Sequence, residues 1–575
     1  MKRTLLVLAF AATSLPGHAQ MQTADLVLRH GTVLTVDAKD RVAQAVAIRD
    51  GRIVAVGTDT VVAKLIGPKT KVIDLAGRTV TPGLMDTHIH LLEGVTGSLL
   101  NVELTHAASV AEILEKIKAK AAQTPAGEWV QGFGWNEGVI AEHRSPTLAE
   151  LDAVTVGHPV FLENVTHHYA MVNSAGLVKL GIDAATKSPA GGTIVHDADG
   201  KPTGVLKEKA NSDAIDAIPA KTAEQLQKGI QAALDQIHAE GLTGVKDIVT
   251  PDTWAAYLTY TRRSAKTGGL TAHVCPLMWV GYPLTAEAAL EAIQKGRADS
   301  AAVKDGDLTI CGAKILLDGS AMGRTAWRNE DYPADPRRPG VPVGRGYPIV
   351  EPTQYTAMVK LFNAAGVPVG THAIGDRAID LAVDSYAEAL KENPKTGLRH
   401  SIIHAHEPTA HALDVMQELQ KKYDAGYPEA QGGFLYFLGD SLPAAFGPEQ
   451  SQHVMPFATY RKMGIVFAGG SDFPVTPLPP RQGLWASVAR EPLKGTFGPH
   501  PFGTEESVDV HVALRSYTAW AARQLFLEKE TGTVEVGKWA DLAVWDRNPY
   551  SVPTAELKDM KCTMTLYKGK VVFER

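Results

Sequence analysis

Two histidines two residues apart, His88 and His90, close the segment TPGLMDTHIH at residues 81–90. If this segment is a β-strand, the two side chains share one face and both imidazoles can reach a single ion. Neutral imidazole is a common ligand of zinc and similar metals, and Asp86 is near enough to orient or join such a site. With 20 histidines in 575 residues, roughly 0.7 such pairs are expected by chance, so the pair alone is a weak signal.

Four further polar residues stand within or at the end of separate apolar runs, namely Lys314, His372, His404 and Asp472. Each has an ordinary explanation when taken alone, because a buried histidine is more often a hydrogen-bonded core residue and a buried lysine can form a structural ion pair. Together they offer imidazoles, a carboxylate and an amine, which suit metal-assisted hydrolysis if the fold brings them together.

Eight β-like apolar runs alternate with helix-like stretches, which is typical of βα units around a parallel sheet. The runs span residues 82–90, 241–249, 271–280, 312–320, 366–376, 401–407, 431–439 and 464–472. Eight units predict an α/β protein built on a TIM (β/α)8 barrel, whose active site lies at the carboxyl ends of the strands. The candidate residues fall on strands one, four, five, six and eight, which makes coincidence a poor explanation.

The segments on either side of the barrel share a different pattern. Residues 20–82 and 526–575 show short alternating apolar runs broken by Gly and Asp. We expect both chain ends to form one small β-sandwich-like domain, largely antiparallel, with the barrel domain at 83–525 inserted between them.

The interval from about 95 to 225, between barrel strands one and two, is much longer than an ordinary βα connection. It contains strand-like and helix-like runs of its own. We expect an inserted subdomain over the barrel mouth, and a second independent domain is the alternative.

The composition limits the classes of partner. Hydrophobic residues make up 45% and charged residues 21%, which indicates a globular chain, and the net charge of −6 comes without any basic block. Nucleic acid is therefore not expected as a partner, whereas a small-molecule substrate is. The sequence does not fix the oligomeric state, and a homo-oligomer is allowed.

The three cysteines, Cys275, Cys311 and Cys562, are odd in number and widely spaced, so disulfides are not expected to stabilise the fold, and Cys311 is expected to be a core residue.

The first residues have the order of features of a secretory signal peptide. Lys2 and Arg3 precede an apolar run from Leu5 to Ala12, and small residues before Gln20 predict a signal peptide at 1–19. The apolar run is too short to span a bilayer as a mature helix. We expect a protein without a membrane span that is exported to the periplasm or the medium.

Eight segments carry a resemblance to a known family: TPGLMDTHIH, HYAMVNSAGL, GGTIVHDADGKPTGVLKE, GAKILLDGSAMGRTA, THAIGDRAID, RHSIIHAHE, GGSDFPV and GTVEVGKWADLAVWD. In these segments the chain resembles the amidohydrolase superfamily, and within it the amidohydrolase-3 branch that includes N-substituted formamide deformylases. They cover almost the whole mature chain. They are specific for the family and say little about the substrate.

The resemblance implies a site for one or two divalent metal ions, of which zinc is the first choice, with ligands His88, His90, His372, His404 and Asp472. Asp472 would also shuttle the proton. Lys314 matches a lysine that some relatives carry as a carbamate bridging two metals, because an ammonium cannot bind a cation. The alternative is a free amine, paired with Asp318 or with a substrate carboxylate.

The resemblance also implies a second group of residues that face the substrate. His168 and Asn173 match a His and an Asn of the inserted subdomain, where they would bind substrate or polarise its carbonyl. We expect Arg324 and Trp327, which follow strand four, to help bind the substrate. Simple packing of the insert or the loop explains each of these residues equally well.

The strand-six segment RHSIIHAHE departs from the family pattern in two ways. Ile403 stands where many relatives have a glutamate, and His406 follows two residues after His404. Both imidazoles would face the same way on a strand, so His406 competes with His404 as a ligand. The family position favours His404.

Together these observations predict an exported metal-dependent hydrolase that cleaves a non-peptide C–N bond in an amide, N-acyl or formamide substrate. The same site would serve an ester or lactone hydrolase, a deaminase or a cyclic amide hydrolase. An exported binding protein without catalysis is a further alternative, against which the proton-shuttling carboxylate argues.

Overall fold

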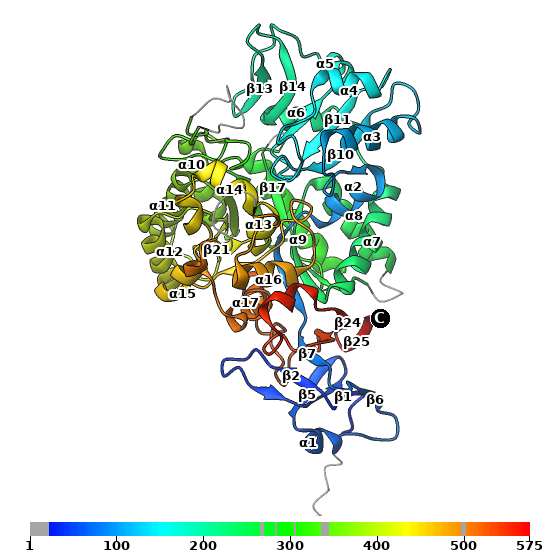
Figure 1. Cartoon of the computed structure of the whole chain (residues 1–575). Coiled ribbons are helices and arrows are strands. Elements are labelled where there is room, and N and C mark those ends of the chain that lie inside the picture. Colours follow the sequence, from blue (N-terminus) through cyan, green and yellow to red (C-terminus); the bar gives the residue numbers. More distant parts are fainter. Residues whose placement is uncertain (1–21, 265–268, 282–283, 304–305, 335–343, 496–501) are drawn as a thin grey trace, which may run out of the picture.

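The computed structural model describes residues 22–264, 269–281, 284–303, 306–334, 344–495 and 502–575. Three parts follow one another along the molecule in Figure 1: a small β domain (blue and red), the barrel (green to orange) and the insert (cyan). The expected signal peptide lies outside the described residues.

The barrel is formed by parallel strands at eight positions, the third of which is split in two. They are β8 (Leu84–Ile89), β15 (Leu242–Val249), β16 (His273–Val274) with β17 (Leu277–Val280), β18 (Gly312–Leu316), β19 (Val369–Ala373), β20 (Ser401–His404), β21 (Tyr427–Ala430) and β22 (Ala468–Gly469). Side-chain and backbone bonds close the ring between the first and last strands: Thr87 Oγ1 donates to Gly469 O at 3.1 Å, and Asp472 N donates to His88 O at 2.8 Å. The predicted TIM barrel is confirmed.

Strand seven was wrongly placed by the sequence. The predicted run 431–439 instead begins with the short helix α13 (Gly432–Phe437), and the strand is β21, whose sequence YPEA is buried throughout. In the sequence β21 does not resemble a buried strand, because it contains Pro428 and Glu429. The Glu429 carboxylate can be buried there because it forms an ion pair with Lys246 of β15. The apolar residues Phe434 and Leu435 led to the prediction of a strand here, because a buried helix needs the same apolar side chains as a buried strand.

The outer layer of helices is held by apolar stripes at helical spacing. In α7 (Ala223–Ala239), Leu226, Ile230 and Ile237 are buried, and a capping box of Thr222 and Gln225 begins the helix. The other helices of this layer are α2 (Leu91–Leu100), α8 (Pro251–Ser264), α9 (Ala286–Val303), α10 (Pro352–Ala364), α11 (Asp376–Glu392), α12 (Ala410–Tyr423) and α15 (Phe457–Met463). After β22 come α16 (Pro480–Ala489), α17 (Val510–Ser516) and α18 (Ala519–Gln524).

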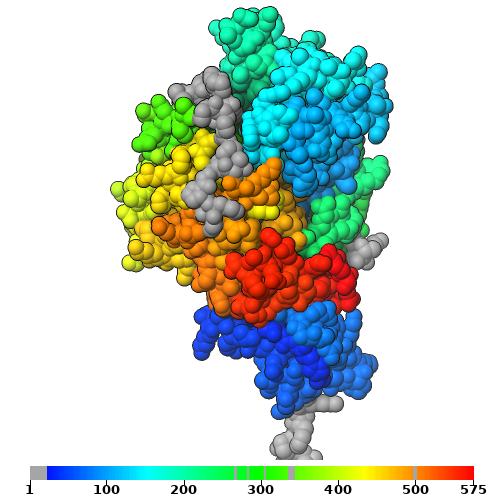
Figure 2. All heavy atoms as spheres, viewed as in Figure 1, coloured from blue at the N-terminus to red at the C-terminus, as the bar shows by residue number. Residues whose placement is uncertain are grey.

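The two chain ends share one sheet. Its order is β25 (Lys570–Glu574), β24 (Cys562–Tyr567), β23 (Leu542–Trp545), β7 (Thr79–Pro82), β2 (Thr32–Leu34) and β3 (Val42–Ala43). The junction is the antiparallel pair β7–β23, in which Leu542 lies opposite Pro82 and Trp545 opposite Thr79. In Figure 2 the red C-terminal segment lies between the blue N-terminal strands and the barrel.

A second sheet completes the small domain, with the order β5 (Arg52–Gly57), β4 (Ala45–Arg49), β1 (Leu26–Arg29) and β6 (Lys71–Asp74). The two sheets share a core that includes Val46 and Leu542. The domain is mixed rather than purely antiparallel, because β1 pairs with β6, and β2 with β7, in parallel.

The insert between barrel strands one and two has its own sheet, with the order β13 (Gly192–His196), β14 (Pro202–Glu208), β12 (Tyr169–Val172), β11 (Val160–Asn164), β10 (Val130–Trp135) and β9 (Val102–Glu103). Helices α3 (Val110–Ala121), α4 (Leu148–Val154), α5 (Ser174–Leu180) and α6 (Lys209–Asp216) pack on it. A separate core around Ile113, Ile117 and Leu162 holds it together.

The expectation that disulfides do not stabilise the fold was wrong, whereas Cys311 is buried in the core, as expected. Cys275 and Cys311 form a disulfide with a Cα–Cα distance of 5.3 Å, and Cys562 is buried and free. Cys275 precedes β17 and Cys311 precedes β18, and these strands are neighbours. Sequence spacing alone does not reveal such a pairing, because it arises only when the barrel aligns the two strands.

None of the helices in the described part of the chain is both long and apolar enough to cross a membrane.

A buried ionic cluster joins the barrel to the small β domain. His273 of β16 lies between two aspartates, with its Nε2 2.9 Å from Asp541 and its Nδ1 3.3 Å from Asp307. Tyr567 and Lys568 of the C-terminal segment also contact this cluster. Burial alone would lower the pKa of His273, but the two carboxylates outweigh it and raise this pKa to about 9.

Replacing His273 with glutamine should remove one component of the pH dependence of stability. The His273 pKa is raised from 6.5 to about 9 in the folded state, so the charged imidazole stabilises the fold fully below pH 6.5, and this contribution is lost as the pH rises through about 9. The loss is up to about 3 kcal/mol. Unfolding midpoints measured from pH 6 to 10 should fall less steeply in the variant.

His400 provides the matched control, because burial lowers its pKa to about 3. Its contribution does not change between pH 7 and 10, so His400→Gln should keep the wild-type slope there. An unchanged slope in His273→Gln would show that the cluster is not charged as described.

Candidate metal centre

Three buried donors converge at the carboxyl ends of three barrel strands. His88 lies in β8, His404 ends β20, and Asp472 follows β22. One ligand atom from each of the three side chains lies within 4.8 Å of the other two. His88 Nε2 is 3.1 Å from Asp472 Oδ1, and the rings of His88 and His404 have centroids 5.3 Å apart.

The charge states of these side chains suit a cation. Burial lowers the pKa of His88 to about 3 and that of His404 well below its usual value, so both imidazoles are neutral. Burial by itself would raise the pKa of Asp472, but the neighbouring histidines hold it well below the ordinary range. Two neutral imidazoles and one carboxylate are a donor set that fits a divalent metal ion.

Residues outside the donor set orient its side chains. The Oε1 atom of Gln431, directly after β21, is 2.7 Å from His404 Nδ1, which leaves His404 Nε2 for the centre. The Asp86 carboxylate accepts from the backbone N–H groups of His88 and Ser471 and so fixes the turn that carries Asp472. The sequence reasoning missed Gln431, whose only signal was its position after a strand that was itself misplaced.

The backbone is unusual at two donors. His404 has φ = 78° and Asp472 has φ = 56°, both in the left-handed region. Non-glycine residues are rarely held there, and such conformations gather at functional sites because the surrounding structure must maintain them.

His90 and His372 border the three-donor set. His90 Nε2 is 3.4 Å from Asp472 Oδ1, and the ring centroid of His372 is 4.4 Å from that of His404. His372 Nε2 also lies 3.2 Å from Gly319 O. The structure therefore brings all four predicted histidines and Asp472 to one place.

Lys314 of β18 reaches the same place, and its Nζ lies 3.2 Å from His88 Nε2. Burial lowers the pKa of this amine to about 8. The alternative pairing of Lys314 with Asp318 is not found. Instead, Asp318 accepts from the backbone N–H groups of Trp327, Ile374 and Gly375 and so orders two loops at the barrel mouth.

The insert contributes His168 from the turn between β11 and β12. Its ring centroid is 4.8 Å from that of His372, and its Nδ1 lies 2.8 Å from Glu208 Oε2. Burial by itself would lower the pKa of His168, but Glu208 outweighs burial and raises it. His168 thus faces the centre as expected.

Asn173 does not face the centre, which corrects the expectation of a substrate contact. Its Oδ1 caps α5 by accepting from Gly176 N and also accepts from Val160 N. Its Nδ2 donates to Thr155 Oγ1 and to His158 O. The amide is therefore fully used inside the insert, and HYAMVN resembled a site segment because His168 and this helix cap are close in sequence.

Arg324 and Trp327 lie in the loop after β18. Arg324 is largely buried, has φ = 57° and extends Nη2 to within 3.5 Å of Ala444 O. The Trp327 indole is half-buried beneath the guanidinium of Arg377 at 4.4 Å. Both order the loop at the barrel mouth, and their contact with substrate stays a prediction.

His406 is separate from the donor set. It is buried between Phe434 and Phe446, neither ring nitrogen has a hydrogen-bond partner, and its ring centroid is 5.8 Å from that of His404. The strand β20 ends at His404 and Ala405 also has positive φ, so strand alternation no longer applies to His406. The geometry favours His404.

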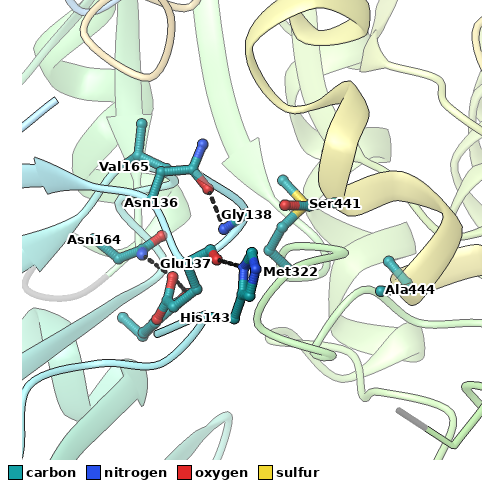
Figure 3. Close-up of a pocket in the computed structure, with 11 residues that line it drawn as sticks. Asn136, Glu137, Gly138, His143, Asn164, Val165, Met322, Ser441 and Ala444 are labelled. Carbon is teal, nitrogen blue, oxygen red and sulfur yellow. Dashed lines mark hydrogen bonds between the residues drawn. The ribbon is translucent and has the colours of Figure 1, made fainter. Parts of the chain in front are cut away.

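A small cavity lies where the insert meets the barrel loops. Figure 3 shows Glu137, His143 and Asn164 on the insert side facing Met322 and Ala444. Its volume of about 30 Å³ has room for a water molecule but not for a substrate. Asn164 and Tyr169 donate to Glu137 here, so this cavity belongs to the junction between the two parts.

The fold and the donor set define a metal-dependent hydrolase built on a TIM barrel. The amidohydrolase family matches residues 71–573, and the chain belongs to this family.

Relatives match over nearly their full length. The N-substituted formamide deformylase of Arthrobacter pascens is 30% identical over 96% of this chain and 99% of its own. YtcJ of Bacillus subtilis strain 168, an amidohydrolase by name, is 29% identical over 92% of this chain and 96% of its own. An uncharacterized metal-dependent hydrolase from Pyrococcus horikoshii OT3 superposes with a TM-score of 0.69 and 26% identity, covering 92% of this chain and 99% of that one.

Proposed function

We propose that this protein is an exported amidohydrolase that cleaves a non-peptide C–N bond of a small amide, N-acyl or formamide substrate. The observation that carries the proposal is the convergence of two neutral imidazoles and one ionised carboxylate, from His88, His404 and Asp472, at the barrel mouth. His90 and His372 stand beside these donors and complete the proposed ligand set.

A divalent ion held by these residues, with zinc as the first choice, supplies Lewis acidity that lowers the pKa of water and polarises a carbonyl. Asp472, held ionised at the centre, accepts the proton of the attacking water and then donates it to the leaving nitrogen. An amine leaves poorly unless it is protonated, so this second transfer is what an amide substrate requires. His168 faces the same space and donates a hydrogen bond to the carbonyl oxygen as negative charge develops on it.

The chemical state of Lys314 decides whether the proposed site holds one ion or two. Its Nζ is 3.2 Å from His88 Nε2, where an ammonium would compete with a cation. A carbamate formed there with CO₂ would add a carboxylate-like donor and support two ions, whereas a free amine would leave one. Metal-to-protein ratios from elemental analysis distinguish these states, and the mass of the intact protein shows whether CO₂ is attached.

Two observations support export. The first residues follow the pattern of a signal peptide, and Cys275 and Cys311 are joined in a disulfide. Disulfides persist mainly in oxidising compartments such as the periplasm and the extracellular space. N-terminal sequencing of the protein recovered from the periplasm or medium should begin at Gln20, and retention of the full chain in the cytoplasm would contradict export.

Paired substrates test the reaction class. The zinc-loaded protein should hydrolyse N-substituted formamides and N-acyl amines faster, relative to the uncatalysed reaction, than esters with the same acyl and leaving groups. The reason is that Asp472 protonates the leaving group, which benefits an amine far more than an alkoxide. A strong preference for the esters would replace the proposed activity with ester or lactone hydrolysis.

A further inference from the structure

Glu208, the last residue of β14, holds His168 at two points. Its backbone N–H donates to His168 O at 2.8 Å, and its carboxylate Oε2 lies 2.8 Å from His168 Nδ1. The Glu208 side chain is almost wholly buried. The position of the imidazole is therefore fixed by the backbone and by the side chain of the same residue.

The second carboxylate oxygen of Glu208 reaches across to the barrel. Glu208 Oε1 accepts from Thr325 Oγ1, and Thr325 belongs to the ordered loop after β18 that also contains Trp327. The carboxylate is thus shared between an imidazole of the insert and a hydroxyl of the barrel. It forms a bridge that exists only when the insert is seated on the barrel mouth.

The surroundings leave space for this bridge and for little else. A Cβ atom on Gly319 would lie 2.2 Å from both Glu208 Oε1 and Thr325 Oγ1, so any side chain at this position would displace the bridge. Glu208 itself has φ = 51° and ψ = −119°, outside the favoured regions for a residue with a side chain. Such a conformation persists only when neighbouring contacts enforce it.

We propose that Glu208 is a positioning residue for the reaction: its carboxylate accepts the Nδ1–H of His168, turns the Nε2–H of the same ring toward the substrate carbonyl, and ties that geometry to the seating of the insert through Thr325. The proposal rests on the proposed function, in which His168 acts on the carbonyl oxygen. Holding one ring nitrogen with a carboxylate is a general way to set the orientation of an imidazole.

The test is a double-mutant cycle on the zinc-loaded enzyme. Glu208→Ala should lower kcat about 100-fold with little change in KM, since loss of one hydrogen-bond donor to a developing oxyanion typically costs about 10²- to 10³-fold. Glu208→Gln keeps an acceptor for Nδ1–H and should recover about one tenth of wild-type kcat. In a His168→Gln background, Glu208→Ala should cost almost nothing more, because its effect acts through His168. A multiplicative loss in the double variant would overturn the proposal.

Glu163 offers a matched control. It holds the adjacent histidine, His167, with the same 2.8 Å spacing to Nδ1, but the ring of His167 makes none of the imidazole contacts described at the centre. Glu163→Gln should keep kcat within about threefold of wild type, as for a substitution away from the reacting groups. An equal loss in Glu163→Gln and Glu208→Gln would mean that the insert is merely destabilised, and would overturn the specific role of Glu208.

A readout independent of turnover separates this inference from the proposed function. The ¹⁵N shifts of His168, assigned by their loss in His168→Gln, should report an Nδ1–H that is hydrogen-bonded to a carboxylate in the wild type, and this hydrogen-bond signature should be lost in Glu208→Ala. If the protein hydrolyses neither amides nor esters but shows this change, the proposed function fails while the positioning by Glu208 stands. Unchanged shifts in Glu208→Ala would refute the positioning whatever the activity.

Discussion

Replacing Asp472 with asparagine should lower kcat by roughly 10²- to 10⁴-fold on the best amide substrate, the range expected for loss of a group that transfers protons. The Asp472 carboxylate is buried, ionised, and 3.1 Å and 3.4 Å from the Nε2 atoms of His88 and His90. An amide side chain keeps the shape and one oxygen donor but cannot accept a proton. Steady-state kinetics together with elemental analysis of the purified variant check this expectation.

The metal content is the internal control, since the Asp472→Asn protein should retain its ion. Asp37→Asn supplies a matched variant: Asp37 is also buried and its pKa is also lowered from its ordinary value, despite burial, through Arg41. It lies in the small β domain, so this variant should turn over at the wild-type rate. Full activity in Asp472→Asn would exclude the assigned role, and loss of both metal and activity would make Asp472 a ligand only.

Removal of the metal should abolish turnover, and zinc or a similar divalent ion should restore it. All the acid–base and binding groups remain after dialysis against a chelator such as EDTA, but water is then too weak an acid for Asp472 to activate. The check is activity measured against metal content during removal and stepwise return of the ion. Activity that survives prolonged chelation in protein shown to be free of metal would refute metal dependence.

Histidine variants show whether the ion is bound where the donors converge. His404→Leu should lower the metal-to-protein ratio and the activity together, because it removes one of the three closest donors. His406→Leu is its control, since the His406 ring lies between Phe434 and Phe446 without a hydrogen-bond partner. Loss of metal in His406→Leu but not in His404→Leu would exchange their roles.

The barrel and most of its donors were predictable because each is marked by a pattern of residues that are close together in the sequence. Each of His88, His372, His404 and Asp472 ends or follows an apolar run, and a barrel gathers strand ends at one face. Strand seven was misplaced because its own residues include Pro428 and Glu429, which do not form an apolar run. The charge of Glu429 is compensated by Lys246, which lies on a strand far away in the sequence.

The residues that the sequence did not reveal act through partners distant in the chain. Gln431 matters because it contacts His404, Glu208 because it contacts His168 and Thr325, and the Cys275–Cys311 disulfide because two strands become neighbours. Asn173 shows the converse error, in which a residue next to a site segment serves only to cap a helix. Polar types and spacing predict which groups are available, whereas orientation needs the tertiary structure.

The pairing of β7 with β23 also governs the order in which this protein can fold. The edge of β7 that pairs with β23 has no partner strand until residues 542–545 have left the ribosome and, if the protein is exported, crossed the membrane. During that time β7 is an open strand edge, which invites incorrect pairing and aggregation. Because such a long-range contact closes slowly, completion of the small domain should be the late step of folding. Loss of the final strands should therefore lower the yield of soluble protein even though they lie far from the metal centre.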